Sequence, residues 1–189
     1  MDITRIRIKA PVEITQLKLG VPQNYRQEMI NELYRIGDKM GHSTNVKAIM
    51  TNYELWNDSP KFKPFLNNIK KIVDKTQILD SKYENLLVSA WGSIYKKDHH
   101  AVPHSHEPAI YSWVYYLKTD EYSSPLMFEG GELAITVEDD LLVIFPGYLW
   151  HTVPPQKEGG DRLVLAGNYI WSLKNNKNNK KNEKNEKYI

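Results

Sequence analysis

The spacing of apolar residues in the first part of the chain predicts two amphipathic helices. In Asn24–Met40 these residues recur at helical intervals, at Met29, Ile30, Leu33, Ile36 and Met40. Gly41 follows directly and is typical of a helix end, so we expect the helix to end there. A second helix begins at Ser59-Pro60, because proline fits the first turn of a helix. Its apolar stripe continues at Phe65, Ile69, Ile72 and Val73.

The pattern changes from about Leu86, where short apolar stretches rich in Tyr, Trp and Val replace the helical spacing. Turn-forming residues separate these stretches, among them Pro146-Gly147. The predicted strands are Leu86–Tyr95, Ala109–Leu117, Pro125–Phe128, Glu132–Val137, Leu141–Phe145, Trp150–Val153 and Arg162–Trp171, with Val12–Leu19 near the N-terminus. Short strands at regular spacing predict a mainly β protein, a sandwich or barrel, with the helices flanking one outer sheet face.

The length of 189 residues, with 41% hydrophobic residues, fits a single domain, which we place at residues 1–172 with its β core at about 86–172. The C-terminal segment 173–189 has six Lys and two Glu, and Lys174–Lys187 contains only Asn, Lys and Glu. Such a segment cannot form an apolar face, so we expect a disordered tail. The remaining residues carry a net charge of −2, so only the tail offers a basic surface to nucleic acid.

Several classes of protein are disfavoured by what the sequence lacks. The longest apolar stretches, such as Leu141–Phe145, are too short to span a bilayer. No secretory signal is visible, and the absence of cysteine excludes disulfides, thiolate metal sites and a cysteine nucleophile. We therefore expect no membrane partner and a cytoplasmic location, in the host cytoplasm if the chain is viral. The sequence does not indicate an oligomeric state.

Three histidines in the β half form the strongest candidate site. His104 and His106 are two residues apart, and in a strand such residues project to the same face. Two imidazoles on one face can bind one metal ion, and imidazole suits Fe, Zn, Cu and Ni. His151 is the natural third ligand, because it follows a predicted strand and turn that can direct a side chain back into a barrel.

The order of these features resembles the 2-oxoglutarate/Fe(II)-dependent dioxygenases, and most closely the prolyl-hydroxylase-like enzymes and the oxygenases of phages and marine bacteria. That family folds as a double-stranded β-helix, or jelly roll, with a His-x-Asp pair, a distal His and a following Arg. Here His104-Ser105-His106 stands at the pair, His151 at the distal His, and Arg162 eleven residues later. The resemblance covers about 86–171.

The resemblance implies an oxygenase that uses Fe(II), 2-oxoglutarate and O2 to hydroxylate a substrate that the sequence does not identify. The three histidines would hold the iron and act in catalysis. Arg162 would pair with the distal carboxylate of 2-oxoglutarate, since guanidinium binds carboxylates bidentately. Tyr116 and Tyr95 stand where the family has tyrosines near the cosubstrate. Asn168 is expected to face the same pocket, because it is an even number of residues from Arg162 on one strand.

His106 departs from the family pattern, which has a carboxylate at that position. Three interpretations follow: a three-histidine site, a site in which Glu107 replaces His106, or a metal protein that is not an oxygenase. A cupin-like protein shares the scaffold and the paired histidines but has no need of Arg162. A non-catalytic binding module is the third class, with the aromatic strand Tyr111–Tyr116 as its recognition surface.

Overall fold

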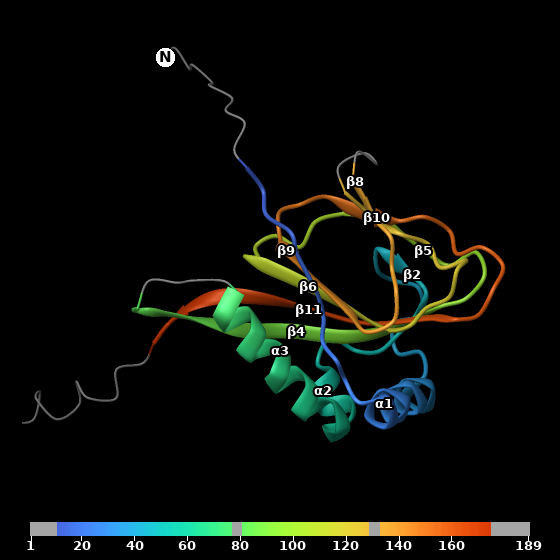
Figure 1. The fold of residues 1–189 in the computed structure, drawn as a ribbon, viewed down its shortest axis with the longest axis horizontal. Coiled ribbons are helices and arrows are strands. Elements are labelled where there is room, and N and C mark those ends of the chain that lie inside the picture. The colour runs from blue at the N-terminus through green and yellow to red at the C-terminus, as the bar shows by residue number, and fades with distance from the viewer. Residues whose placement is uncertain (1–10, 77–80, 129–132, 175–189) are drawn as a thin grey trace, which may run out of the picture.

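The chain folds into two antiparallel sheets with three helices on one side (Figure 1). The computed structural model describes residues 11–76, 81–128 and 133–174, so most of the predicted disordered tail lies outside the described residues. The six-stranded sheet has the order β1-β9-β6-β11-β4-β3 and the five-stranded sheet the order β2-β5-β10-β7-β8. Their bounds are β1 Thr15–Lys18, β2 Val46–Lys47, β3 Ile49–Met50, β4 Tyr83–Tyr95, β5 His100–His104, β6 Tyr111–Lys118, β7 Leu126–Phe128, β8 Leu133–Ile135, β9 Leu141–Pro146, β10 His151–Val153 and β11 Arg162–Leu173.

The helices cover the outer face of the six-stranded sheet, as the early position of the amphipathic segments predicted (Figure 1). They are α1 Gln23–Ile36, α2 Leu55–Asp58 and α3 Lys63–Thr76, the last preceded by a 3-10 turn at Pro60–Phe62. Buried apolar residues of α1 and α3 pack against outward-facing residues of the sheet, including Met29, Leu33, Phe65, Ile69, Leu163 and Leu165. This layer is the first of two cores.

The predicted end of the first helix at Gly41 was wrong. The helix ends at Ile36, and Gly37 follows with φ of +70° while its N–H donates to the Leu33 carbonyl oxygen. Glycine adopts this left-handed conformation without steric cost, so the first of two nearby glycines ends the helix. Met40 therefore lies outside the helix, where it packs at the edge of the second core.

The second core lies between the two sheets and surrounds the candidate site. Alternation along β11 divides the two cores: Leu163 and Leu165 face the helices, whereas Val164 and Ala166 face the barrel interior. Trp91 and Tyr95 of β4 share that interior face, since side chains two residues apart point the same way. Strand alternation thus directs the even-numbered residues of β11, Arg162 among them, into the barrel.

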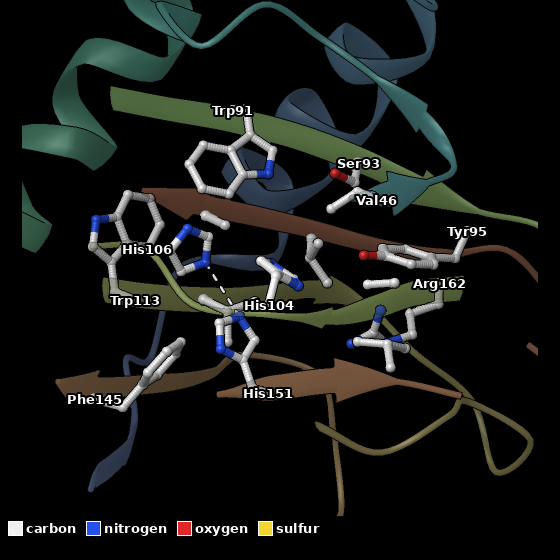
Figure 2. A pocket seen from close by; sticks show the side chains of 15 residues that line it. Val46, Trp91, Ser93, Tyr95, His104, His106, Trp113, Phe145, His151 and Arg162 are labelled. Carbon is white, nitrogen blue, oxygen red and sulfur yellow. Dashed lines mark hydrogen bonds between the residues drawn. The ribbon is translucent and has the colours of Figure 1, made fainter. Parts of the chain in front are cut away.

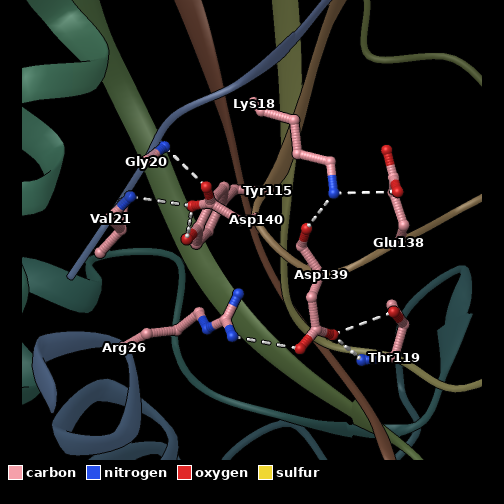
Figure 3. A network of polar contacts seen from close by, with 9 residues as sticks. All are labelled: Lys18, Gly20, Val21, Arg26, Tyr115, Thr119, Glu138, Asp139 and Asp140. Carbon is pink, nitrogen blue, oxygen red and sulfur yellow. Dashed lines mark hydrogen bonds and ion pairs between the residues drawn. The ribbon is translucent and has the colours of Figure 1, made fainter. Parts of the chain in front are cut away.

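Strand β1 pairs with β9, and an acidic corner formed by Asp139 and Asp140, just before β9, holds the segment that follows β1 (Figure 3). Asp140 accepts hydrogen bonds from the N–H groups of Gly20 and Val21, at 2.6 and 3.1 Å, and from the Tyr115 hydroxyl at 2.7 Å. Asp139 accepts from the N–H of Thr119 at 2.6 Å and pairs with Arg26 of α1 at 3.3 Å. These bonds connect the segment after β1 and helix α1 with the neighbouring strands β6 and β9.

The predicted strands of the β half are all present where the structure describes them, with small shifts at their ends. The short strands β2, β3 and β5 and the one-turn helix α2 were not predicted as elements. No described helix has the length and apolar character needed to cross a membrane.

Candidate metal and cosubstrate site

The three histidines predicted to bind metal lie together inside the barrel (Figure 2). His104, the last residue of β5, is directly opposite His151, the first residue of β10, in the antiparallel register. Their side-chain nitrogens and one from His106 lie within 4.8 Å of one another. The ring centroids are 4.4 Å apart for His104 and His151 and 4.9 Å apart for each pair that includes His106.

The position of His106 in the cluster is not explained by strand alternation, because His106 lies outside β5. It lies two residues beyond the end of β5, and its backbone N–H donates to the Gly147 carbonyl oxygen at 2.8 Å. A side chain at Gly147 would collide with the backbone carbonyl of Ala109, so glycine permits this close approach of the two loops. Glu107 is exposed and is not part of the cluster.

Backbone carbonyls orient two of the imidazoles for metal binding. Nδ1 of His104 lies 2.7 Å from the Val102 oxygen, and Nδ1 of His151 lies 2.9 Å from the Leu149 oxygen. A carbonyl oxygen only accepts, so each Nδ1 carries the proton and each Nε2 keeps a free lone pair. Nε2 of His106 lies 3.2 Å from Nε2 of His151.

This separation of nitrogens fits two ligands of a single ion. Ligands about 2.1 Å from one metal are about 3.0 Å apart at a right angle and about 3.4 Å apart in a tetrahedron. The 3.2 Å between His106 and His151 falls between these values. Burial lowers the pKa of His104, and it lowers the pKa of His106 to about 3 and of His151 to about 4, with the neighbouring histidines adding to the effect. All three imidazoles are therefore neutral near pH 7, as metal coordination requires.

Arg162 lies at the other end of the same cavity, between two tyrosine rings. Its guanidinium carbon is 4.6 Å from the ring centroid of Tyr95 and 5.1 Å from that of Tyr116. The side chain is 1% exposed, and its Nε and Nη1 have no hydrogen-bond partner among the described residues. A buried cation with unused donors is costly, so this arrangement suits an anionic ligand.

The two tyrosines hold different positions around this cation. Tyr95 lines the cavity, whereas Tyr116 is fully buried and does not line it. The Tyr116 hydroxyl also lacks a partner among the described residues. Burial raises the pKa of both hydroxyls and the Arg162 charge opposes that shift. Both groups stay protonated and able to donate at neutral pH.

One cavity connects the histidines with Arg162, and it includes a residue that the sequence did not single out. Ser93 of β4 lies on the cavity wall between Trp91 and Tyr95 (Figure 2). It is 1% exposed, and its hydroxyl has no hydrogen-bond partner among the described residues. Its only signal in the sequence is its spacing of two residues from Tyr95 on one strand.

Asn168 faces the barrel interior, but it does not line the cavity that contains Arg162. Six residues along a strand correspond to about 20 Å. Asn168 instead lines a second chamber, whose wall also includes His104, His106 and Trp91. Asn168 thus lies on the interior face of β11, but that face alone does not bring it to the chamber that contains Arg162.

Comparison with known proteins finds relatives by structure alone. No family model matches the chain, and no curated protein matches its sequence. Among solved structures, it is similar to the viral collagen prolyl hydroxylase vCPH from Paramecium bursaria Chlorella virus-1 in its 2-oxoglutarate complex. That match has a TM-score of 0.64 and 11% identity, and covers 82% of this chain and 94% of the other. The chain has the double-stranded β-helix fold of the 2-oxoglutarate/Fe(II) oxygenases.

Two further matches show the same fold. A prolyl-4-hydroxylase from Pseudomonas putida has a TM-score of 0.60 and 14% identity, over 82% of this chain and 91% of the other. HygX from Streptomyces hygroscopicus, with nickel and 2-oxoglutarate bound, has a TM-score of 0.65 and 13% identity, over 84% of this chain and 82% of the other. The comparisons confirm the predicted jelly roll and give no support to a phage source.

Proposed function

We propose that this protein is an Fe(II)- and 2-oxoglutarate-dependent oxygenase that hydroxylates its substrate with O2. The observation that carries the proposal is one cavity with a three-histidine cluster at one end and, at the other, a buried arginine whose Nε and Nη1 have no hydrogen-bond partner among the described residues. The fold of the oxygenases, in which other members hold iron or nickel and 2-oxoglutarate, supports it.

The charges of the cavity fit this pair of ligands. Three neutral imidazoles leave the double positive charge of a divalent ion uncompensated, and Arg162 adds one more positive charge. 2-Oxoglutarate is a dianion whose two carboxylates can meet the ion and the guanidinium. A site with a carboxylate in place of His106 would be one unit less positive, so the three-histidine set favours anion binding more strongly.

Each residue then has a defined task. His104 and His151 hold the ion through Nε2 while their Nδ1–H groups bond to backbone carbonyls, and His106 completes the face. Arg162 binds the distal carboxylate, and the hydroxyls of Tyr95 and Ser93 provide donors along the cavity wall. Apolar walls such as Val114 and Phe145 exclude water. When bound, Fe(II) and 2-oxoglutarate supply the oxidising chemistry, and the protein supplies geometry and a dry pocket.

Anaerobic titration with Fe(II) and then 2-oxoglutarate tests the proposal. We expect a visible charge-transfer band that saturates with 2-oxoglutarate, and succinate formation once O2 is admitted. The His104→Ala variant should lose the band, whereas His100→Ala, on the same strand but outside the cluster, should keep it. If the wild-type protein gives neither band nor succinate, the proposal is wrong.

A cupin-like metal protein is the second candidate, favoured by the three-histidine set itself. Such a protein would bind metal without using Arg162, so replacing Arg162 by Ala would leave its activity unchanged. The unpaired donors of Arg162 at the end of the metal cavity argue for the oxygenase instead. A non-catalytic binding module would require that titration with Fe(II), Zn(II) or Ni(II) shows no bound ion.

A further inference from the structure

The histidine cluster lies between two chambers of different character. The first extends from the histidines to Arg162 and is the cosubstrate cavity proposed above. The second shares His104, His106, Trp91 and Val46 with the first, but its wall includes Asn168 and not Arg162. A ligand in the second chamber would therefore contact His104 and His106 without contacting Arg162.

The second chamber is polar but uncharged. Its hydrogen-bonding wall includes Thr44, Asn45, Tyr53, Ser105 and Asn168. Within the three described stretches of the chain, no Lys, Arg, Asp or Glu lines it. A carboxylate, phosphate or ammonium held against Asn168 would lose hydration, and no side chain of this wall would offer it a partner of opposite charge. The wall therefore favours a group that hydrogen-bonds without formal charge.

Two serines fix the amide of Asn168 at the wall of this chamber. The Ser112 hydroxyl of β6 donates to Oδ1 at 2.8 Å, and Nδ2 donates to the Ser89 hydroxyl of β4 at 3.1 Å. Ser112 is 1% exposed, so this network is set within the sheet. An amide has two donor hydrogens and two acceptor positions, so Asn168 retains one N–H and one lone pair for a ligand.

We propose that the second chamber receives the substrate, and that Asn168 selects an uncharged carboxamide group over a charged group of the same shape. This inference rests on the proposed function for the meaning of "substrate". A carboxamide offers an acceptor and a donor side by side, which matches the spare donor and acceptor of Asn168. A carboxylate could use only the donor and an ammonium only the acceptor, so each would leave one polar group unpaired.

The test uses three small probes of one shape, propanamide, propionate and propylammonium, at constant ionic strength. Isotope-labelled protein is loaded with Zn(II), which is diamagnetic, and 2-oxoglutarate. The side-chain N–H₂ signals of Asn168 are assigned by their absence in Asn168→Asp and followed by NMR. We expect these signals to shift saturably with propanamide, with a Kd about tenfold lower than for either charged probe.

Two variants test whether Asn168 is responsible for the preference for propanamide. Asn168→Asp should weaken propanamide binding about tenfold and leave 2-oxoglutarate binding unchanged, because Arg162 is in the other chamber. Asn31→Asp, the same change at an exposed position of α1, should alter neither. If Asn168→Asp does not fold, the ranking of the probes on the wild-type protein decides the question.

The inference is overturned if propionate or propylammonium binds as tightly as propanamide, if propanamide does not bind, or if it binds without moving the Asn168 signals. These results are separate from a failure of the proposed function. If 2-oxoglutarate itself does not bind, the titrations are repeated on the metal-free protein, where no ion is present to bind propionate and the same ranking of probes is expected.

Discussion

The histidine cavity and the acidic corner both contain several polar groups. In the corner these groups are hydrogen-bonded to one another, whereas in the cavity some of them have no partner among the described residues. In the corner, the Asp140 carboxylate accepts three hydrogen bonds and Asp139 is bonded to Thr119 and paired with Arg26. In the cavity, Ser93 and Arg162 present buried groups without partners among the described residues, and the Tyr116 hydroxyl beside Arg162 also lacks one. Both regions include residues of β6: Tyr115 bonds to the corner, and Val114 lines the cavity from the opposite face of the strand.

We interpret the bonded groups of the corner as stabilising the fold, and the unpaired groups of the cavity as available to bind a ligand. A buried polar group that is fully bonded contributes to stability, whereas one left unpaired costs free energy until something binds it. The corner should therefore matter for folding and not for ligands. The cavity should matter for ligands and should cost stability while it is empty.

The largest expected effect is on metal binding. His104→Ala should raise the Kd for Fe(II) or Ni(II) at least ~100-fold, because it removes a ligand whose partners are already oriented. Isothermal titration of the variant against the metal measures this. His100→Ala is the matched control on β5, and an equal loss in both variants would contradict the assignment of the cluster.

The next effect concerns the cosubstrate. Arg162→Met should raise the Kd for 2-oxoglutarate about 100-fold, the loss of a charge-assisted pair. The free energy of unfolding without ligand should stay the same or rise, because a buried cation with unused donors is removed. Arg26→Met, which breaks the ion pair with Asp139, should leave 2-oxoglutarate binding unchanged. A large loss of stability in Arg162→Met would show that the guanidinium is structural.

Stability should depend on the acidic corner instead. Asp140→Asn should lower the free energy of unfolding by about 2 kcal/mol, because an amide cannot accept all the hydrogen bonds that the carboxylate accepts. Asparagine tolerates the positive φ of this residue, +67°, so backbone strain does not contribute. Urea denaturation measures the change, and metal affinity should stay within about twofold. If Asp140→Asn bound metal poorly yet unfolded like the wild type, the corner would matter for ligand binding and not for stability, contrary to our interpretation.

Acid should destabilise the metal-free protein through the cavity. The pKa values of His106 and His151 are lowered to about 3 and about 4, below the ordinary value of 6.5. Their stabilising effect is therefore complete above about pH 6.5 and is lost as the pH falls towards 4. We expect a decrease of about 2 kcal/mol per histidine between pH 7 and 5, measured by denaturation, and a smaller decrease in His106→Gln. An unchanged pH profile in that variant would place the acid sensitivity elsewhere.

A second acid transition should lie at lower pH and belong to neither region. Hydrogen bonds from Arg35 and Ser59 and the neighbouring Lys61 lower the pKa of Glu32 to about 2 from 4.5. Its contribution to stability is present above about pH 4.5 and is lost below that. In Glu32→Gln, the free energy of unfolding should depend less on pH below about pH 4.5. Its decrease between pH 7 and 5, which we assign to the histidines, should stay unchanged.

The smallest effect is expected at the exposed rim of the corner. Glu138 pairs with Lys18 at 2.9 Å, but their side chains are 58% and 52% exposed. Such surface pairs contribute little, so Glu138→Gln should change the free energy of unfolding by less than ~0.5 kcal/mol. A change as large as that of Asp140→Asn would mean that the whole corner acts as one network.

The sequence was most informative where chemistry and spacing coincide. His104, His106, His151 and Arg162 were predicted from their order, and the fold brings all four to one cavity. Ser93 was missed, because a lone serine in a strand gives no signal apart from its spacing to Tyr95. The unpaired state of its hydroxyl depends on packing across the barrel, which no local pattern encodes.

The face of a strand on which a residue lies does not determine how far that residue is from another residue on the same face. Alternation along β11 indicates that Asn168 faces the interior, but Asn168 and Arg162 line different chambers beside the histidines. The helix end was missed for a similar reason. Gly37 and Gly41 are equally good candidates locally, and Asp38 decides between them by accepting from the N–H groups of Met40, Gly41 and Met50, a contact between distant segments.

A crystal structure of the protein with Mn(II) or Fe(II) and 2-oxoglutarate, grown without O2, tests the central claim most directly. We expect one ion bonded to Nε2 of His104, His106 and His151 at about 2.1 Å, with the distal carboxylate of 2-oxoglutarate against Arg162. An ion bound by Glu107 in place of His106, or 2-oxoglutarate located away from Arg162, would contradict it.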